Sequence, residues 1–143
     1  MLARREYPRA ELSERLVRRG ADAAEVARVL DDLEQRGYLS DARFAQMLVT
    51  QKAGRYGKRA IAHALTQRRV ASTAVDAALD SLDNVDELAE ATVVWQRRFP
   101  DPPQDERDRA RQIRFLMSRG YTVSIALKIV RRPGTPGSDT ESA

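Results

Sequence analysis

Positive charge in this chain of 143 residues is gathered into stretches that contain almost no acidic residue. Residues 52–69 hold six basic side chains and no acidic one, and in residues 107–132 the only acidic residue is Asp108. Residues 76–90 show the opposite pattern, with six acidic side chains and no basic one. Blocks of this kind create strong local fields of both signs, which suit contact with a polyanion, with an oppositely charged protein, or with both.

We predict that the basic stretches contact nucleic acid or a nucleoprotein filament. Tyr56 lies between Arg55 and Lys58 in a glycine-flanked segment, and an aromatic ring among cations is typical of nucleic-acid contacts. An alternative stays open, because basic residues at the end of a helix are also favoured by its dipole, and a run of charge often forms only a solvated face. The candidate binding residues are Arg55, Tyr56, Lys58, Arg59, Arg68, Arg69, Arg111, Arg114, Arg119, Lys128 and Arg131.

The acidic block has two interpretations. It is either the solvated face of a helix or a patch that meets a basic surface of a protein partner. The candidate patch consists of Asp76, Asp80, Asp83, Asp86, Glu87 and Glu90.

Catalytic chemistry is not indicated by the sequence. The acidic residues have no nucleophile or glycine-rich phosphate loop beside them. His63 is the only histidine and there is no cysteine, so we expect no metal site and no cofactor. No apolar run approaches the length of a membrane span, and the first residues lack the apolar core of a signal peptide. We expect a soluble, non-enzymatic, cytoplasmic protein that acts as a monomer.

The elements that must position these residues are helices, because apolar residues recur with helical spacing and never alternate as in strands. One helix-turn-helix pattern is written three times without gaps, in residues 9–30, 58–79 and 109–130. Leu16, Leu65 and Leu116 coincide in the three copies. Each copy is too small to bury its own apolar face, so the copies must stack.

Local signals mark the helix ends. Asp22 with Glu25, Ser40 or Asp41, and Asn84 with Glu87 are predicted to begin helices. Gly20 and Gly120 stand where the first helix of a copy must stop, a place that favours left-handed backbone. The second copy has Arg69 there, which predicts a different turn or some strain.

These signals divide the chain into segments. We predict a first repeat of three helices in residues 1–52, a second in 53–99, a proline-rich linker in 100–106 and a truncated third repeat of two helices in 107–132. Residues 53–57 and 100–105 are expected to be exposed connections. The tail, 133–143, is predicted to be disordered.

The motifs GYLSDARFAQMLV, KAGRYGKRAIAHAL and IRFLMSRGY, with LARREYPRAELSERLVRRG near the start, resemble the RecX family of recombinase regulators. The resemblance covers roughly residues 2–132. It implies an all-α fold of tandem three-helix repeats stacked into a curved, elongated array. It also implies binding to the filament of RecA on single-stranded DNA, and weakly to duplex DNA, and a link to DNA repair and the SOS response. Such proteins inhibit the recombinase, ATPase and co-protease activities of the filament by hindering its growth or promoting its disassembly.

The alternative is a helix-turn-helix transcriptional regulator, in which the second helix of a copy enters the major groove of duplex DNA. The second helices of the first two copies carry Asp31, Asp32, Asp76 and Asp80, which would oppose phosphates. Sequence-specific recognition of duplex DNA is therefore the weaker interpretation.

Overall fold

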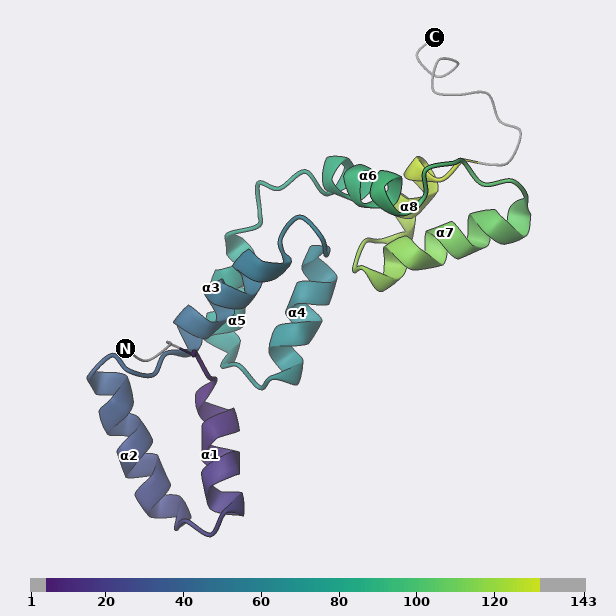
Figure 1. Cartoon of the computed structure of the whole chain (residues 1–143). Coiled ribbons are helices and arrows are strands. Elements are labelled where there is room, and N and C mark those ends of the chain that lie inside the picture. The colour runs from purple at the N-terminus through teal and green to yellow at the C-terminus, as the bar shows by residue number, and fades with distance from the viewer. Residues whose placement is uncertain (1–4, 132–143) are drawn as a thin grey trace. The chain divides into compact units, whose positions relative to one another are not determined.

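The computed structural model describes residues 5–131, and within that range the chain forms eight helices and no strand (Figure 1). The predicted all-α class is confirmed, whereas the tail predicted to be disordered lies outside the described residues. The helices are α1 (Arg9–Arg18), α2 (Ala23–Gln35), α3 (Asp41–Lys52), α4 (Lys58–Gln67), α5 (Ser72–Asp80), α6 (Glu87–Arg98), α7 (Glu106–Ser118) and α8 (Val123–Ile129).

The chain forms two compact units, which we call unit 1 and unit 2. Among the described residues, unit 1 contains 5–53 and 61–84, and unit 2 contains 54–60 and 85–131. Helix α4 therefore begins in unit 2 and continues into unit 1. No helix in residues 5–131 has both the length and the apolar character that crossing a membrane requires.

Helix starts follow the predicted caps at two of three positions. The carboxylate of Asp22 accepts the backbone N–H of Glu25 at 3.1 Å, and Oγ of Ser40 accepts that of Arg43 at 3.1 Å. The predicted cap at Asn84 is wrong, because α6 begins two residues later and Asp86 accepts the N–H of Ala89. An ionised carboxylate is favoured there, because it meets the positive end of the helix dipole.

The turns inside the three copies share one backbone conformation. Gly20 has φ of +102° and Gly120 has φ of +96°, as the sequence predicts for these positions. Arg69 has φ of +58° and is the only described non-glycine residue with a positive φ. The second copy thus keeps the left-handed turn at the cost of steric strain on an arginine.

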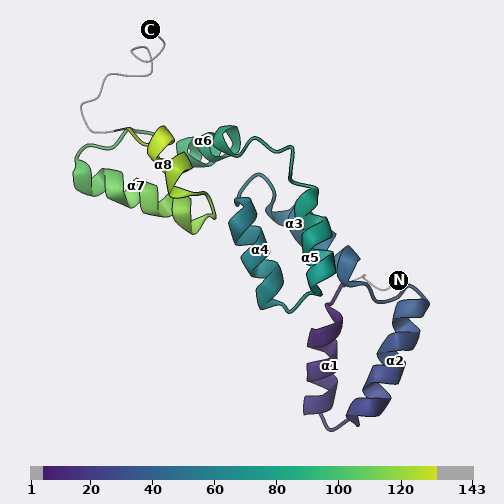
Figure 2. The same cartoon turned by 180° about the vertical axis from the view of Figure 1, so that it is seen from behind.

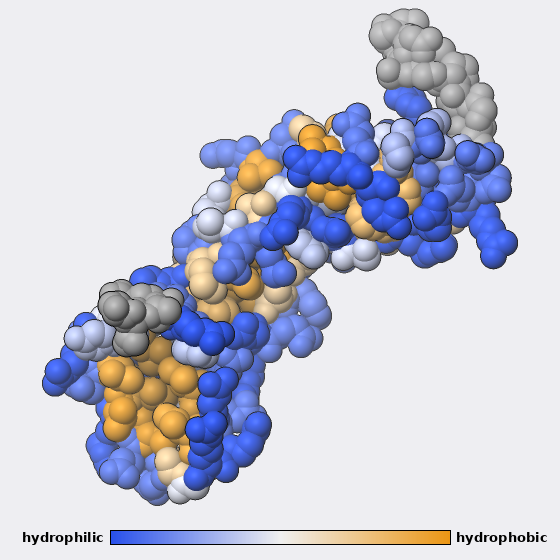
Figure 3. All heavy atoms as spheres, viewed as in Figure 1, coloured by the Kyte–Doolittle hydropathy of each residue, from blue (hydrophilic) through white to orange (hydrophobic). Residues whose placement is uncertain are grey.

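Unit 1 combines a helix pair with a three-helix group. Helices α1 and α2 lie side by side (Figures 1 and 2), and α3 packs against α5. The carboxylate of Asp41 joins the two parts, because it accepts the N–H of Arg9 at 2.8 Å and that of Ala71 at 2.7 Å. Figure 3 shows an apolar area over α1 and α2. Val29, on α2, is 49% exposed.

The aligned leucines differ in burial. Leu65 and Leu116 are fully buried, whereas Leu16 is only half-buried beside the core of Val26, Leu30 and Leu39. For Leu116 the reason is that α6 packs on α7 and α8, whereas no described helix packs on the pair α1–α2 in the same way.

In unit 2, helices α6, α7 and α8 pack on one another around Ala91, Leu116, Tyr121, Ala126 and Val130. The indole N–H of Trp95 donates to the buried side chain of Gln112 at 2.7 Å, which satisfies a polar group inside this core.

The segment before α4 also belongs to this unit and is less exposed than the sequence suggests. Gly57 is buried, and its N–H donates to the carbonyl of Arg119 at 2.6 Å. In the proline-rich connection, Pro103 is buried as well.

Candidate nucleic-acid interface

The main concentration of arginines in unit 2 surrounds a small open cavity of roughly 250 Å³. It is lined by Arg55, Val94, Arg97, Arg98, Phe115 and Arg119. No carboxylate lines it. The cavity therefore presents positive charge around an apolar wall made by one aliphatic and one aromatic side chain.

Helix ends bring these residues together. Arg97 and Arg98 occupy the last turn of α6, and Arg119 is the C-cap residue of α7. Cations at these positions interact favourably with the negative end of a helix dipole. Arg55 comes from the segment before α4, and its carbonyl accepts a hydrogen bond from the guanidinium of Arg119 at 3.3 Å.

Arginine and aromatic side chains alternate in a continuous series along this part of unit 2. The guanidinium of Arg119 lies 4.8 Å from the ring centre of Tyr56 and 5.1 Å from that of Phe115. The guanidinium of Arg98 lies 5.8 Å from Phe115 and 4.8 Å from Phe99. These cation–π contacts hold the guanidinium groups in place without neutralising them.

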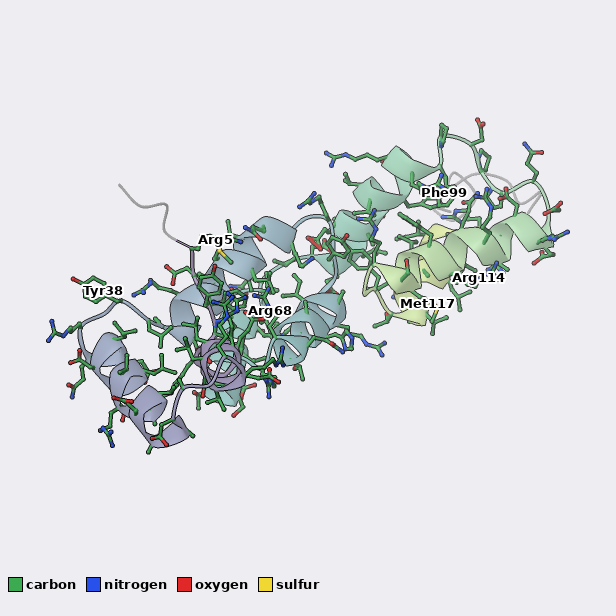
Figure 4. All side chains as sticks on the ribbon, turned by 60° about the horizontal axis from the view of Figure 1, so that its bottom comes forward. Arg5, Tyr38, Arg68, Phe99, Arg114 and Met117 are labelled. Carbon is green, nitrogen blue, oxygen red and sulfur yellow. The ribbon has the colours of Figure 1, made fainter. Side chains whose placement is uncertain are left out.

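The series ends at Arg111, whose guanidinium lies 5.1 Å from the ring of Phe99 (labelled in Figure 4). Arg111 also pairs with Asp108 at 2.8 Å. The hydrogen bond from Arg111, helped by one from the backbone N–H of Gln104, lowers the pKa of Asp108. In contrast, Arg97, Arg98 and Arg119 form no ion pair within residues 5–131, so their charge is available to a ligand.

Two of the predicted binding residues, Arg68 and Arg69, form ion pairs within unit 1. Arg68 forms a two-point ion pair with Glu11, at 2.9 and 2.7 Å, and its guanidinium lies 4.8 Å from the ring of Phe44. This pairing lowers the pKa of Glu11, chiefly through the hydrogen bond from Arg68. Arg69 pairs with Glu14. Both arginines hold α1 against the end of α4.

The other predicted basic residues are spread over both ends of unit 2. Lys58 and Arg59 begin α4, where Arg59 is exposed. Arg114 lies on the outer side of α7 (Figure 4) and lines a shallow hollow with Arg107 and Arg111 that also contains Asp105 and Asp108. Lys128 is exposed on α8 and Arg131 is half-buried after it.

The residues of the predicted acidic patch are divided between the two units. Asp76, Asp80 and Asp83 lie in unit 1, where all three are exposed. Glu87, in unit 2, accepts the backbone N–H of Lys58 at 2.7 Å. Glu90 accepts the N–H of Gly54 at 2.7 Å and the hydroxyl of Tyr121 at 3.1 Å.

The hydrogen bonds of Asp86, Glu87 and Glu90 stabilise unit 2. Burial, followed by the charge of Glu90, raises the pKa of the Tyr121 hydroxyl. Asp86, Glu87 and Glu90 thus cap α6 and fasten the segment before α4 to it.

The sequence interpretation missed Arg97 and Arg98, although it included Arg55, Tyr56, Arg111 and Arg119. The signal was available, because two adjacent arginines end α6 in the same way as Arg68 and Arg69 end α4. Phe44 and Phe99 are buried, whereas Trp95 and Phe115 are partly buried. In residues 5–131, no three potential ligands from His, Asp and Glu converge as a metal site would need.

Comparison with known proteins identifies the family. Models of RecX match in order along the chain: the first three-helix domain at residues 1–33, the second at 40–79 and the third at 85–130. The latter two ranges correspond to α3–α5, in which α3 packs on α5, and to α6–α8, which pack on one another.

Two relatives and one solved structure agree with this match. The regulatory protein RecX of Leptothrix cholodnii is 42% identical over 130 residues, which are 91% of this chain and 82% of the relative. That of Halorhodospira halophila is 43% identical over 124 residues, 85% of this chain and 76% of the relative. The crystal structure of RecX from Lactobacillus salivarius is similar in fold, with a TM-score of 0.70 at 14% identity, covering 88% of this chain and 84% of that one. This chain belongs to the RecX family.

Proposed function

We propose that this protein is a non-enzymatic, cytoplasmic regulator that binds the filament of RecA on single-stranded DNA. It lowers the recombinase, ATPase and co-protease activities of the filament by blocking growth or promoting disassembly, and it acts as a monomer. The observation that carries the proposal is the ordered match of three RecX domains to 1–33, 40–79 and 85–130.

The charge distribution of unit 2 supports this function. A regulator of a nucleoprotein filament meets both phosphates and protein, and arginines beside aromatic rings, such as Arg98 and Arg119 beside Phe115, suit such a surface. A helix-turn-helix regulator would need a basic second helix in a copy, and among the second helices only α8 of the third copy carries a basic residue, Lys128, without an acidic one. Helix α2 instead exposes Asp31 and Asp32, whose side chains are 68% and 55% accessible.

The test is ATP hydrolysis by RecA on single-stranded DNA, titrated with this protein. We expect inhibition. Inhibition at far fewer molecules than RecA protomers would indicate capping of the filament end, whereas inhibition only near equal amounts would indicate binding along the filament. Hydrolysis by an unrelated DNA-dependent ATPase serves as the control. Unchanged RecA activity at a large excess of this protein would refute the proposal.

A further inference from the structure

The arginine-lined cavity of unit 2 carries a more specific inference, which rests on the proposed function. Four arginines line a space of roughly 250 Å³ with no carboxylate among the lining residues. Like charges at such short range repel one another. An anion that enters the cavity removes this repulsion and gains charge-assisted hydrogen bonds from planar guanidinium groups.

The size of the cavity limits what can enter it. Pockets for whole small-molecule ligands occupy about 300–1,000 Å³. A space of roughly 250 Å³ that is open on one side suits one charged group of a longer ligand that continues over the surface. A polymer with regularly spaced anions meets this requirement.

The apolar wall distinguishes between two kinds of anionic polymer. The ring of Phe115 lies between the guanidinium groups of Arg98 and Arg119, at 5.8 and 5.1 Å. A nucleotide brings a phosphate together with a sugar and a planar base that can pack on this wall. An acidic peptide brings only a carboxylate on a flexible stem, which would leave the wall unused.

We propose that this cavity binds a backbone phosphate of single-stranded nucleic acid, with Arg97, Arg98 and Arg119 contacting the phosphate and Phe115 contacting the attached nucleoside.

The test uses the whole chain and a short fluorescein-labelled oligodeoxythymidylate, whose binding is followed by fluorescence anisotropy at several salt concentrations. The variant R97Q/R98Q removes two exposed charges from the cavity. Its matched control, R19Q/R28Q, removes two exposed arginines from unit 1. We expect R97Q/R98Q to bind roughly tenfold more weakly, and its salt dependence to fall by about 0.7 for each phosphate that the variant no longer neutralises. The control should bind nearly as well as the parent.

Three further probes sharpen the result. R97K/R98K keeps the charge but loses the planar guanidinium donors, so its affinity should lie between those of the parent and R97Q/R98Q. An oligomer of abasic deoxyribose phosphates should bind the parent more weakly than the thymidylate, and polyglutamate should bind much more weakly than either. Suppose that polyglutamate bound the parent as tightly as the thymidylate does, and that R97Q/R98Q lost as much affinity for polyglutamate as for the thymidylate. The cavity would then be a docking site for acidic protein, and the inference would be wrong. An equal loss in the lysine variant would also contradict it.

RecA-dependent ATP hydrolysis, measured in parallel, separates this inference from the proposed function. If the parent inhibits RecA and R97Q/R98Q binds the oligonucleotide as tightly as the parent does, the inference about the cavity fails while the function stands. If R97Q/R98Q loses oligonucleotide binding but the parent never inhibits RecA, the cavity is supported and the function fails. Circular dichroism should show the same helical content for all variants, and R97Q/R98Q should melt only slightly below the parent, since it loses the cation–π contacts of Arg98 and a favourable charge at the end of α6.

Discussion

Gly20 and Gly120 occupy the same place in two copies of the helix-turn-helix pattern. Replacing each with alanine separates the cost of left-handed backbone, which both share, from the cost of a steric clash, which only Gly120 has. Both have positive φ, +102° and +96°. A Cβ atom at Gly20 would meet nothing within 4 Å. At Gly120 it would lie 2.5 Å from Cβ and 2.6 Å from the backbone nitrogen of Ala60.

The magnitudes follow from these surroundings. Left-handed backbone costs alanine about 1–2 kcal/mol, and the stiffer unfolded chain returns about 0.4–1 kcal/mol. Gly20→Ala should therefore destabilise the protein by about 1 kcal/mol. Gly120→Ala has the same cost plus about 1–3 kcal/mol for overpacking against backbone. Moving that backbone away would break the 2.6 Å hydrogen bond between Gly57 and Arg119. We expect a total of about 3 kcal/mol.

Urea denaturation measures the difference. Trp95 is the only tryptophan and lies in unit 2, so its fluorescence reports the unit that contains Gly120. Far-UV circular dichroism reports helices in both units. Gly120→Ala should lower the midpoint of the fluorescence transition strongly, while Gly20→Ala should leave it nearly unchanged. Equal losses for the two variants would show that the close approach at Ala60 does not constrain the turn.

Three further predictions use the same denaturation measurements. Leu65→Ala should cost about 2–5 kcal/mol because Leu65 is fully buried, and Leu16→Ala should cost clearly less; equal costs would contradict the difference in their burial. Arg68→Met should destabilise the protein at neutral pH. Because the folded-state pKa of Glu11 is lowered, this ion pair stabilises the protein above the ordinary glutamate pKa and stops doing so as the pH falls through the folded value. The difference in free energy of unfolding between the parent and Arg68→Met should therefore shrink below about pH 4. A difference that does not change with pH would refute the pairing. Arg69→Gly should be neutral or stabilising, since it relieves left-handed strain while losing one exposed ion pair; a loss well above about 1 kcal/mol would show that the pair matters more than the strain.

Several features could be predicted from the sequence because they depend on neighbouring residues. Helical spacing, the caps at Asp22 and Ser40, and the left-handed turns at Gly20 and Gly120 are all set within a few positions along the chain. The repeat and the RecX motifs are likewise patterns in the sequence itself. The error at Asn84 is of the same local kind, because Asp86 competed for the same helix end and its charge was favoured.

The roles of the arginines were decided only by the tertiary structure. Arg68 stands next to Arg69, and Arg98 stands next to Arg97, each near the end of a helix. The neighbouring sequence therefore gives no reason to expect different roles for them. Arg68 forms an ion pair with Glu11, 57 positions away, and this pair holds α1 against the end of α4. Arg98 contacts the rings of Phe99 and Phe115 and lines a cavity that contains no carboxylate. An ion pair depends on which distant side chains packing brings within a few ångströms, and no local pattern contains that information.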